Sequence, residues 1–224
     1  MNKDFLNHEI AFREDQSIDI NKRSNKKILI LGVGALGSWI AEFLSRQGYS
    51  NLTLLDMDRV ENKNLGSQNF SKKDTGRMKA SCIKNKILLN FESLKIDTIE
   101  KKLAADNANK IIRDFELVID VFDNLESRSI VKKTCKELKI DCLHAGMSDD
   151  GFAEIEWNEF YQIPKSIENM KDVCDYPLAS NLVFITVGLV CEVVNAFVDN
   201  NKKRTVHFTL NDLHVDKLER NHGK

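Results

Sequence analysis

Three glycines and one aspartate early in the chain have the spacing of a nucleotide-binding turn. The apolar run at residues 28–31 leads directly into Gly32, Gly34 and Gly37, and Asp56 follows 19 residues after the last glycine. Gly32 permits a tight turn, Gly34 lets a phosphate approach the backbone, and Gly37 lets the next helix pack closely on the sheet. That helix would direct its N-terminal amides at the anion, and Asp56 could accept hydrogen bonds from ribose hydroxyls. These residues predict a nucleotide site.

Alternating apolar segments predict the elements that would hold this site. We expect buried strands at residues 28–31, 52–55, 96–100, 117–122 and 141–145, and helices at about 36–48, 78–91, 106–113 and 125–138. This alternation is typical of a Rossmann-like, doubly wound, mostly parallel α/β sheet. Period-two patterns at 152–157 and 205–210 predict antiparallel strands added in the C-terminal part. We expect an N-terminal extension at residues 1–25, one domain at 26–215 and a tail at 216–224.

Composition limits the class of protein. A chain of 224 residues that is 42% hydrophobic can bury one sizeable core. The net charge of −1 offers no argument for a nucleic acid or membrane partner, and the basic segment 21–27 is interpreted as a solvated lead-in to the first strand. Five cysteines without a Cys-x-x-Cys pair indicate neither a disulfide framework nor a zinc site. With no apolar segment of signal-peptide length at residues 1–9, we expect a cytoplasmic protein with reduced thiols.

One apolar run lies late in the chain. Residues 182–191 are almost entirely apolar, but the run stops at Glu192 after ten residues, which is shorter than the roughly 20 that a membrane span requires. A helix that is apolar on nearly all sides is buried in a core or a subunit interface. We favour the interface, because both faces of a late helix are hard to cover in a small chain. A homodimer through residues 178–198 is therefore expected.

The loop after Asp56 makes the sequence more specific. Asn64 and Gln68 stand in the polar segment that follows this acid, Lys79 stands in Gly-Arg-Met-Lys-Ala at residues 76–80, and the strand end at 120–124 reads Asp-Val-Phe-Asp-Asn, with Arg128 behind it. In this order, with the glycine turn, these motifs resemble the ThiF/MoeB/HesA family. This is the adenylating fold shared with the E1 enzymes of ubiquitin-like proteins. The resemblance covers residues 26–160 well and 175–215 more loosely.

The resemblance implies an ATP- and Mg²⁺-dependent enzyme. It would adenylate the C-terminal carboxylate of a small ubiquitin-like or sulfur-carrier protein and release pyrophosphate. Asn64 would touch the phosphates, Lys79 would neutralise their charge, Asp123 would position Mg²⁺, and Arg13 would reach the partner subunit's site. The nucleotide-binding residues that the resemblance implies are Gly32, Gly34, Ala35, Gly37, Asp56, Asp58, Asn64, Gln68, Lys79, Asp123 and Asn124.

The chain departs from the family pattern in three places. The family's Asn-Leu-x-Arg-Gln motif has Ser67 where arginine is usual, so either Arg59, Arg77 or a partner's Arg13 compensates, or catalysis is weakened. The zinc-binding Cys-x-x-Cys pairs common in the family are absent. Cys174 stands where E1 enzymes often carry a reactive thiol, but flanking aspartates would raise its pKa. We expect it to be dispensable.

Several residues have simpler explanations. Asp56 could only cap a loop, Asn64 could only form a turn, Lys79 could be a solvated surface lysine, and Asp123 with Asn124 could be only an N-cap pair. His144 ends a strand and is interpreted as a structural histidine whose hydrogen bonds are satisfied.

Two other functions stay open. An NAD(P)-dependent oxidoreductase could use the same glycine turn and acid, but it leaves Asn64, Gln68 and Lys79 without a shared purpose. A degenerate relative could bind nucleotide or a partner without catalysis, and Ser67 with the missing zinc pairs is its best support.

Overall fold

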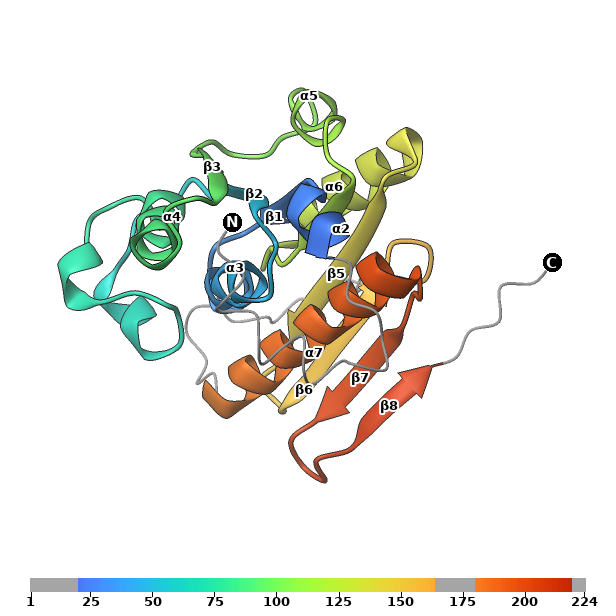
Figure 1. Ribbon diagram of the computed structural model, residues 1–224. Helices are drawn as coiled ribbons and strands as arrows, with labels where there is room; N and C mark the ends of the chain where they lie inside the picture. The colour runs from blue at the N-terminus through green and yellow to red at the C-terminus, as the bar shows by residue number, and fades with distance from the viewer. Residues whose placement is uncertain (1–19, 164–179, 219–224) are drawn as a thin grey trace.

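The computed structural model describes residues 20–163 and 180–218, which form a central sheet with helices on both faces (Figure 1). The strands are β1 (Ile28–Leu31), β2 (Asn51–Leu55), β3 (Lys95–Ile99), β4 (Leu117–Asp120), β5 (Asp141–Met147), β6 (Phe152–Trp157), β7 (Thr205–Thr209) and β8 (Val215–Leu218). The helices are α2 (Ile20–Asn25), α3 (Gly37–Arg46), α4 (Lys79–Asn90), α5 (Ala108–Ile112), α6 (Leu125–Leu138) and α7 (Ser180–Asn200). Two short 3₁₀ helices, η2 (Asn62–Gly66) and η3 (Lys72–Asp74), lie between β2 and α4.

The strand order confirms the predicted fold class. The sheet runs β3-β2-β1-β4-β5-β6-β7-β8; β1 to β5 pair in parallel, and β6, β7 and β8 are added antiparallel. The order reverses at β1, since β2 lies on one side of it and β4 on the other. Such a switch point opens a crevice at the carboxyl ends of the strands, where ligands bind in this class of sheet.

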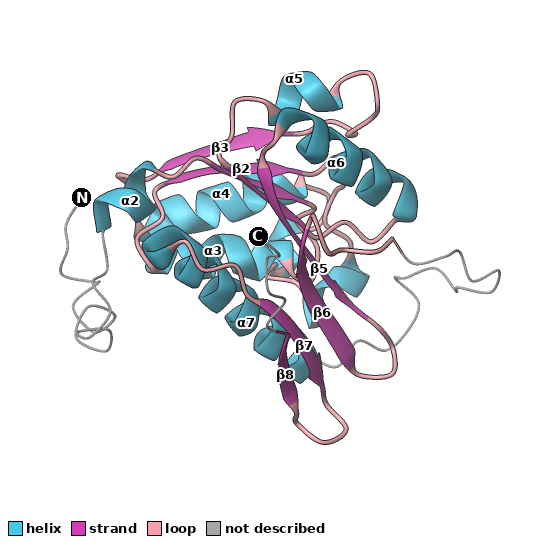
Figure 2. Ribbon diagram, turned by 90° about the vertical axis from the view of Figure 1, so that its right-hand side faces the viewer, coloured by secondary structure: helices cyan, strands magenta, loops and turns pink. Residues whose placement is uncertain are grey.

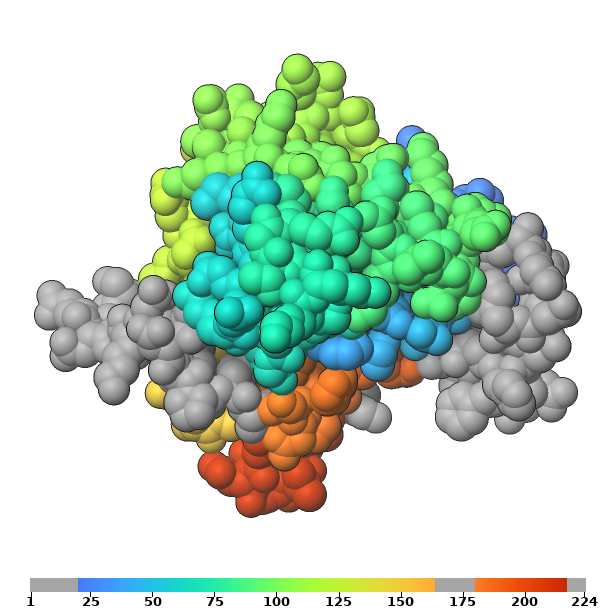
Figure 3. Space-filling view, turned by 90° about the vertical axis from the view of Figure 1, so that its left-hand side faces the viewer, coloured from blue at the N-terminus to red at the C-terminus, as the bar shows by residue number. Residues whose placement is uncertain are grey.

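Two hydrophobic clusters, one on each face, hold the sheet between its helices. The larger joins α3, α4 and α7 to one face, and the smaller joins α5 and α6 to the other (Figure 2). All four residues of β1 are fully buried, which explains its uninterrupted apolar sequence. Figure 3 shows the segment between β2 and β3 (cyan to green) as a continuous surface beside the orange end of α7. This segment carries the polar residues that follow Asp56.

Element boundaries differ from the sequence expectation where tertiary pairing decides them. β5 extends two residues beyond 145, because its end pairs with the antiparallel β6, Met147 opposite Ala153. β4 ends at Asp120, whose side chain accepts a hydrogen bond from the amide of Phe122 and so turns the chain early. The hairpin strand β8 was not predicted; it pairs with β7 and contains residues that we assigned to the tail.

The late apolar helix corrects two inferences. α7 has 21 residues and contains an 18-residue window with a mean hydropathy of 2.0, so by length and composition alone it could cross a membrane, contrary to our length argument. It is instead mostly buried, packed on α3, β5, β6 and β7. The premise that both its faces are hard to cover within this chain is therefore wrong. An exposed stripe at Asn181, Phe184 and Gly188 remains, and the homodimer stays a prediction.

The basic segment before β1 is also not a simple solvated lead-in. Residues 20–25 form α2, and Arg23 is completely buried. Its Nε lies 3.0 Å from Oδ1 of Asp199 on α7, and its Nη1 donates to the carbonyl of Gln47 at the end of α3. Arg23 thus joins three helices. The run of basic residues did not predict this ion pair, because Asp199 stands 176 residues away in the sequence.

Candidate functional site

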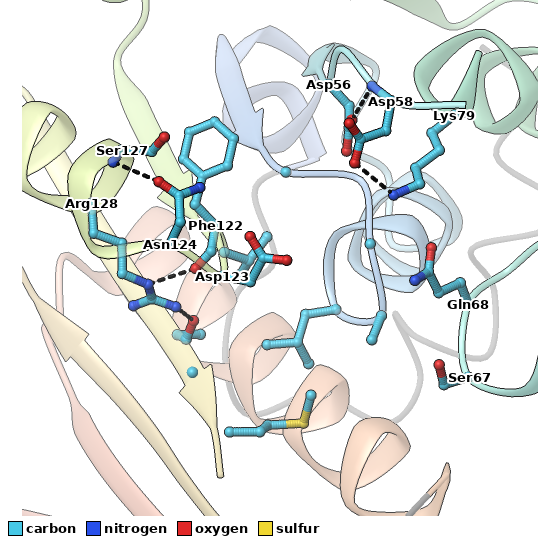
Figure 4. A pocket seen from close by; sticks show the side chains of 18 of the residues that line it. Asp56, Asp58, Ser67, Gln68, Lys79, Phe122, Asp123, Asn124, Ser127 and Arg128 are labelled. Carbon is cyan, nitrogen blue, oxygen red and sulfur yellow. Dashed lines mark hydrogen bonds and ion pairs between the residues drawn. The ribbon is translucent and has the colours of Figure 1, made fainter. Parts of the chain in front are cut away.

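A cavity of about 1060 Å³ opens at the carboxyl ends of β1, β2, β4 and β5 and the start of β6. Ten of the eleven nucleotide-binding residues that the sequence predicted line it: Gly32, Gly34, Ala35, Asp56, Asp58, Asn64, Gln68, Lys79, Asp123 and Asn124. The eleventh, Gly37, is the first residue of α3 and packs against the carbonyl of Gly32. In Figure 4, Asp56, Asp58 and Lys79 lie on one side of the cavity, and Asn124 and Arg128 lie on the other.

The surroundings of the three glycines differ from one position to the next. Gly32 has a φ of +91°, a conformation that side chains rarely adopt. A Cβ added to Gly37 would lie 1.9 Å from the carbonyl oxygen of Gly32, so only glycine fits there. A Cβ added to Gly34 would meet nothing within 4 Å, because this position opens into the cavity. The turn therefore leaves space for a ligand at Gly34 alone.

The N-terminus of α3 faces this space without a protein cap. Leu36 is the N-cap residue and supplies no side-chain hydrogen bond, and the first turn contains no acidic residue. Within the described part of the chain, the amides of Gly34, Ala35 and Leu36 have no hydrogen-bond acceptor. Free amides at a helix N-terminus form a site for an anion such as a phosphate.

Asp56 holds the turn as well as lining the cavity. Its Oδ2 accepts a hydrogen bond of 2.7 Å from the amide of Val33, and its Oδ1 accepts one of 2.8 Å from the amide of Asp58. Burial raises the pKa of this carboxyl, and the two amides with the nearby Lys79 oppose the rise. The loop-capping interpretation is confirmed, and the ribose contact stays a prediction.

Lys79 is a buried cation at the start of α4. Only 8% of the residue is exposed, and its Nζ lies 3.1 Å from Oδ2 of Asp58. Helix starts disfavour lysine, since the helix dipole places partial positive charge there. The solvated-surface interpretation is therefore wrong. The chain keeps this cation at the cavity wall, held by a carboxylate that is itself exposed.

Asn64 and Gln68 present amide groups to the cavity. Asn64 is buried in η2, and its Oδ1 accepts a hydrogen bond of 2.8 Å from the amide of Glu61, so it does form the turn. Its Nδ2 has no acceptor among the described residues, and Asn64 is one of the residues that line the cavity. Oε1 of Gln68 is buried without a partner in the same part of the chain. Both residues have polar atoms available to a ligand.

The sequence left two roles open for Asp123 and Asn124, magnesium binding and capping of the next helix, and the two residues differ in their contacts. Asn124 is the N-cap of α6, and its Oδ1 accepts a hydrogen bond of 2.8 Å from the amide of Ser127. Asp123 is exposed, points into the cavity in Figure 4 and has no hydrogen bond to any described residue. A free carboxylate facing a phosphate site fits Mg²⁺, which takes one or two carboxylates together with phosphate oxygens and water. Only Asn124 is a cap.

The arginines expected to compensate for Ser67 do not reach the cavity. Arg59 donates to the carbonyl of Gly76, and Arg77 lies 3.7 Å from Asp74; neither lines the cavity. The cations that line it, besides Lys79, are Lys63, Lys101, Lys102 and Arg128. The first two possibilities named for compensation are therefore wrong. Arg13 lies outside the described residues, and so does Cys174.

Arg128 has a structural role that the sequence did not predict. Its Nε, Nη1 and Nη2 donate to the carbonyl of Phe122, the hydroxyl of Tyr161 and the carbonyl of Ala145, at 2.6, 3.0 and 2.6 Å. It therefore fixes the ends of β4 and β5 around the cavity. The sequence feature that could have indicated this role is the position of Arg128 on the buried face of α6, three residues before Val131.

His144 is a buried histidine with satisfied hydrogen bonds, as predicted. Its Nδ1 lies 2.8 Å from Oδ2 of Asp120, its Nε2 lies 2.8 Å from Oδ1 of Asn158, and its ring stacks on Tyr161. Nδ2 of Asn158 donates to the carbonyl of Lys132, which orients Oδ1 toward the histidine. Both ring nitrogens therefore face acceptors.

Comparison with known proteins identifies the family of this chain. The ThiF family model matches residues 6–153, which is more than half of the chain. The chain belongs to the ThiF family. Among curated relatives, molybdopterin-synthase adenylyltransferase of Haemophilus influenzae is 31% identical over 151 residues, covering 60% of this chain and 59% of the relative. The tRNA threonylcarbamoyladenosine dehydratase of the same organism is 29% identical over 121 residues, covering 53% and 46%.

Solved structures of other ThiF-like proteins share the fold. MccB of E. coli, crystallised with MccA-N7isoASN, superposes with a TM-score of 0.83 at 17% identity, covering 96% of this chain and 71% of MccB. PaaA superposes with a TM-score of 0.79 at 18% identity, covering 97% and 82%. The chain spans about half the length of the curated relatives named above.

Proposed function

We propose that this ThiF-family protein catalyses ATP- and Mg²⁺-dependent adenylation of the C-terminal carboxylate of a small ubiquitin-like or sulfur-carrier protein. Pyrophosphate is released and an acyl-adenylate forms. The observation that carries the proposal is the convergence of free α3 amides, Lys79, Asn64 and Asp123 on one cavity. Support also comes from the relatives that are adenylyltransferases and from structures of MccB with ATP and with MccA.

The residue types suit this reaction. The attacking carboxylate is already ionised at neutral pH, so the first step needs no general base. The barrier comes from repulsion between the carboxylate and the phosphates and from charge that builds on pyrophosphate. The α3 amides and the ammonium of Lys79 lower this barrier, because they are oriented toward the phosphate site before the ligand binds. Asp56, held by two amides, retains oxygen lone pairs for ribose hydroxyls.

Asp123 would hold the magnesium ion together with the phosphate oxygens. When bound, Mg²⁺ supplies charge neutralisation for the phosphates. The contribution of this chain is a carboxylate that no other described side chain engages. Lys101 and Lys102, at the cavity wall beyond β3, are the positive charges that we propose in place of the arginine missing at Ser67. We also retain a homodimer in the proposal, with Phe184 of α7, 44% exposed, at the interface.

The test is ATP–pyrophosphate exchange in the presence of a candidate carrier with a free C-terminal carboxylate. We expect wild type to catalyse exchange, and Lys79→Met to lower it by roughly 10²- to 10³-fold, since an oriented charge at the reacting phosphates is lost. Lys73→Met is the matched control, because Lys73 is exposed on η3 and does not line the cavity. Equal activity of Lys79→Met and the control would remove Lys79 from the phosphate site.

A degenerate nucleotide-binding relative is the second candidate function, and Ser67 favours it. It predicts ATP binding without exchange. An NAD(P)-dependent enzyme would bind NAD in preference to ATP. Calorimetry with each nucleotide therefore distinguishes it from an adenylating enzyme and from a degenerate relative. Tight binding of NAD without binding of ATP would overturn the proposed adenylation.

A further inference from the structure

Besides the exposed Asp123, a second carboxylate that lines the cavity has no hydrogen-bond partner among the described residues. Glu154 lies on β6, opposite Gly146 of β5, and is half-buried. The other aspartates and glutamates that are not exposed, within residues 20–163 and 180–218, each accept a hydrogen bond or ion pair; they are Glu42, Asp56, Asp74, Asp120, Asp141, Glu156, Glu192 and Asp199. The carboxylate of Glu154, which also lines the cavity, is therefore available to accept a hydrogen bond from a ligand.

The neighbouring arginine does not satisfy Glu154. Three of the five N–H groups of Arg128 donate to carbonyl or hydroxyl oxygens around β4 and β5, and none of its recorded hydrogen bonds goes to Glu154. Arg128 still acts through its charge: burial and the nearby Glu156 raise the pKa of Glu154, and Arg128 opposes this rise. Glu154 therefore has a compensating cation nearby, and no described residue donates a hydrogen bond to it. A neutral N–H group fits it better than a second cation, which Arg128 would repel.

The strand order gives an approximate separation between Glu154 and the proposed phosphate site beside Asp123. β6 is two strands from β4, whose end leads to Asp123, and neighbouring strands are about 4.8 Å apart, so the separation is roughly 10 Å. An extended peptide covers about 3.3 Å per residue, so roughly three residues span it. A peptide whose terminal carboxylate reaches the phosphates beside Asp123 would thus pass Glu154 about three residues earlier.

We propose that Glu154 is a specificity-determining residue that accepts a backbone N–H from the C-terminal tail of the substrate. The inference rests on the proposed function and names its substrate class more closely. The tail is extended, and the residue about three positions before the reacting carboxylate carries a free N–H, so proline is excluded there. Gly146 contributes by lacking a side chain, since a Cβ there would lie 3.3 Å from Nη2 of Arg128 and 3.7 Å from Oε1 of Glu154.

The test removes single N–H groups from a peptide. The probes are an N-acetylated six-residue peptide that ends in Gly-Gly with a free carboxylate, and variants with one backbone nitrogen methylated in turn. Calorimetry with a non-hydrolysable ATP analogue present measures their binding to wild type, to Glu154→Leu and to the control Glu92→Leu. Leucine keeps most of the volume of glutamate and removes the acceptor. Glu92 is exposed and does not line the cavity.

We expect one methylated position, about three residues from the end, to weaken binding to wild type and to Glu92→Leu by about 10- to 100-fold. The same methylation should change binding to Glu154→Leu by less than about twofold. With an accepted carrier, Glu154→Leu should raise KM for the carrier and leave KM for ATP unchanged.

Three results would overturn the inference: no binding of any peptide to wild type, no sensitive position, or equal sensitivity in wild type and Glu154→Leu. Failure of the proposed adenylation is distinguishable from these, because it shows as absent pyrophosphate exchange by wild type while the peptide binding and its dependence on Glu154 persist.

Discussion

Polar residues around the cavity use one group to hold the protein and present another to the ligand. Oδ1 of Asn64 closes η2 while its Nδ2 has no acceptor among the described residues. Both oxygens of Asp56 accept hydrogen bonds from backbone amides, and both residues line the cavity. Lys79 is held by Asp58 in the same way. The local contacts orient each group before a ligand arrives. Such preorganisation reduces the reorganisation that the reaction requires.

Glu154 is different, and its titration gives a prediction. Burial and the charge of Glu156 raise its pKa above the ordinary 4.5. The folded protein therefore binds more protons than the unfolded chain between 4.5 and the raised pKa, and the free energy of unfolding falls as pH rises through this window. Glu154→Gln cannot titrate, so we expect its stability relative to wild type to increase from about pH 4 to about pH 7.

Urea unfolding across this pH range measures the difference. Glu92→Gln is the control, since its carboxylate is exposed in the folded protein and loses little solvation. A stability difference between Glu154→Gln and wild type that is independent of pH would contradict the prediction.

At the scale of elements, the turn between β1 and α3 combines two requirements that different glycines meet. Gly37 is required for packing, because its missing Cβ makes room for the carbonyl of Gly32. Gly34 is required by nothing within the protein, since the space beside it is open. Gly37 therefore meets a requirement of folding and Gly34 a requirement of ligand binding, although the two residues are only three positions apart.

Alanine at each position tests this separation. Gly37→Ala should lower the free energy of unfolding by about 1–3 kcal/mol or more, because the added methyl group overlaps backbone. Gly34→Ala should change stability by less than about 0.5 kcal/mol, yet weaken ATP binding at least about tenfold, because the methyl group occupies the space of a phosphate. Urea unfolding and ATP calorimetry measure the two effects. Equal loss of stability in both variants would contradict this division.

At the scale of the whole molecule, a buried ion pair connects α2, near the start of the described chain, with the late helix α7. Arg23 on α2 pairs with Asp199 on α7 and also donates to the end of α3. Neither residue lines the cavity at the carboxyl ends of the strands. The pair therefore belongs to the assembly of the fold, and the strand-end cavity can act independently of it.

Removing one member of this pair should be costly. We expect Arg23→Met to lower the free energy of unfolding by about 3–5 kcal/mol, since it leaves the Asp199 carboxylate buried without its cation. Combining it with Asp199→Leu should recover part of the loss. ATP binding should not change. Lys27→Met, at an exposed position, is the control. A double variant as unstable as the sum of both single variants would contradict the coupling.

The sequence by itself determined what short-range physics controls. The apolar period and the glycine spacing located β1, the turn and α3, and the helix at 125–138 was predicted at its observed bounds. The polar loop after Asp56 and the strand end at Asp123 were placed at one edge of the sheet, because parallel strands bring their carboxyl ends together. These signals depend on residues that are neighbours in the chain.

Only the tertiary structure decided contacts between distant residues. It paired Arg23 with Asp199, covered α7 with the chain's own sheet, kept Arg59 and Arg77 away from the cavity, and left Glu154 without a donor. Periodicity records which face of an element is apolar, but not which element covers that face. Long-range pairing depends on the register and order of strands, and these become fixed only when the whole sheet closes around its two cores.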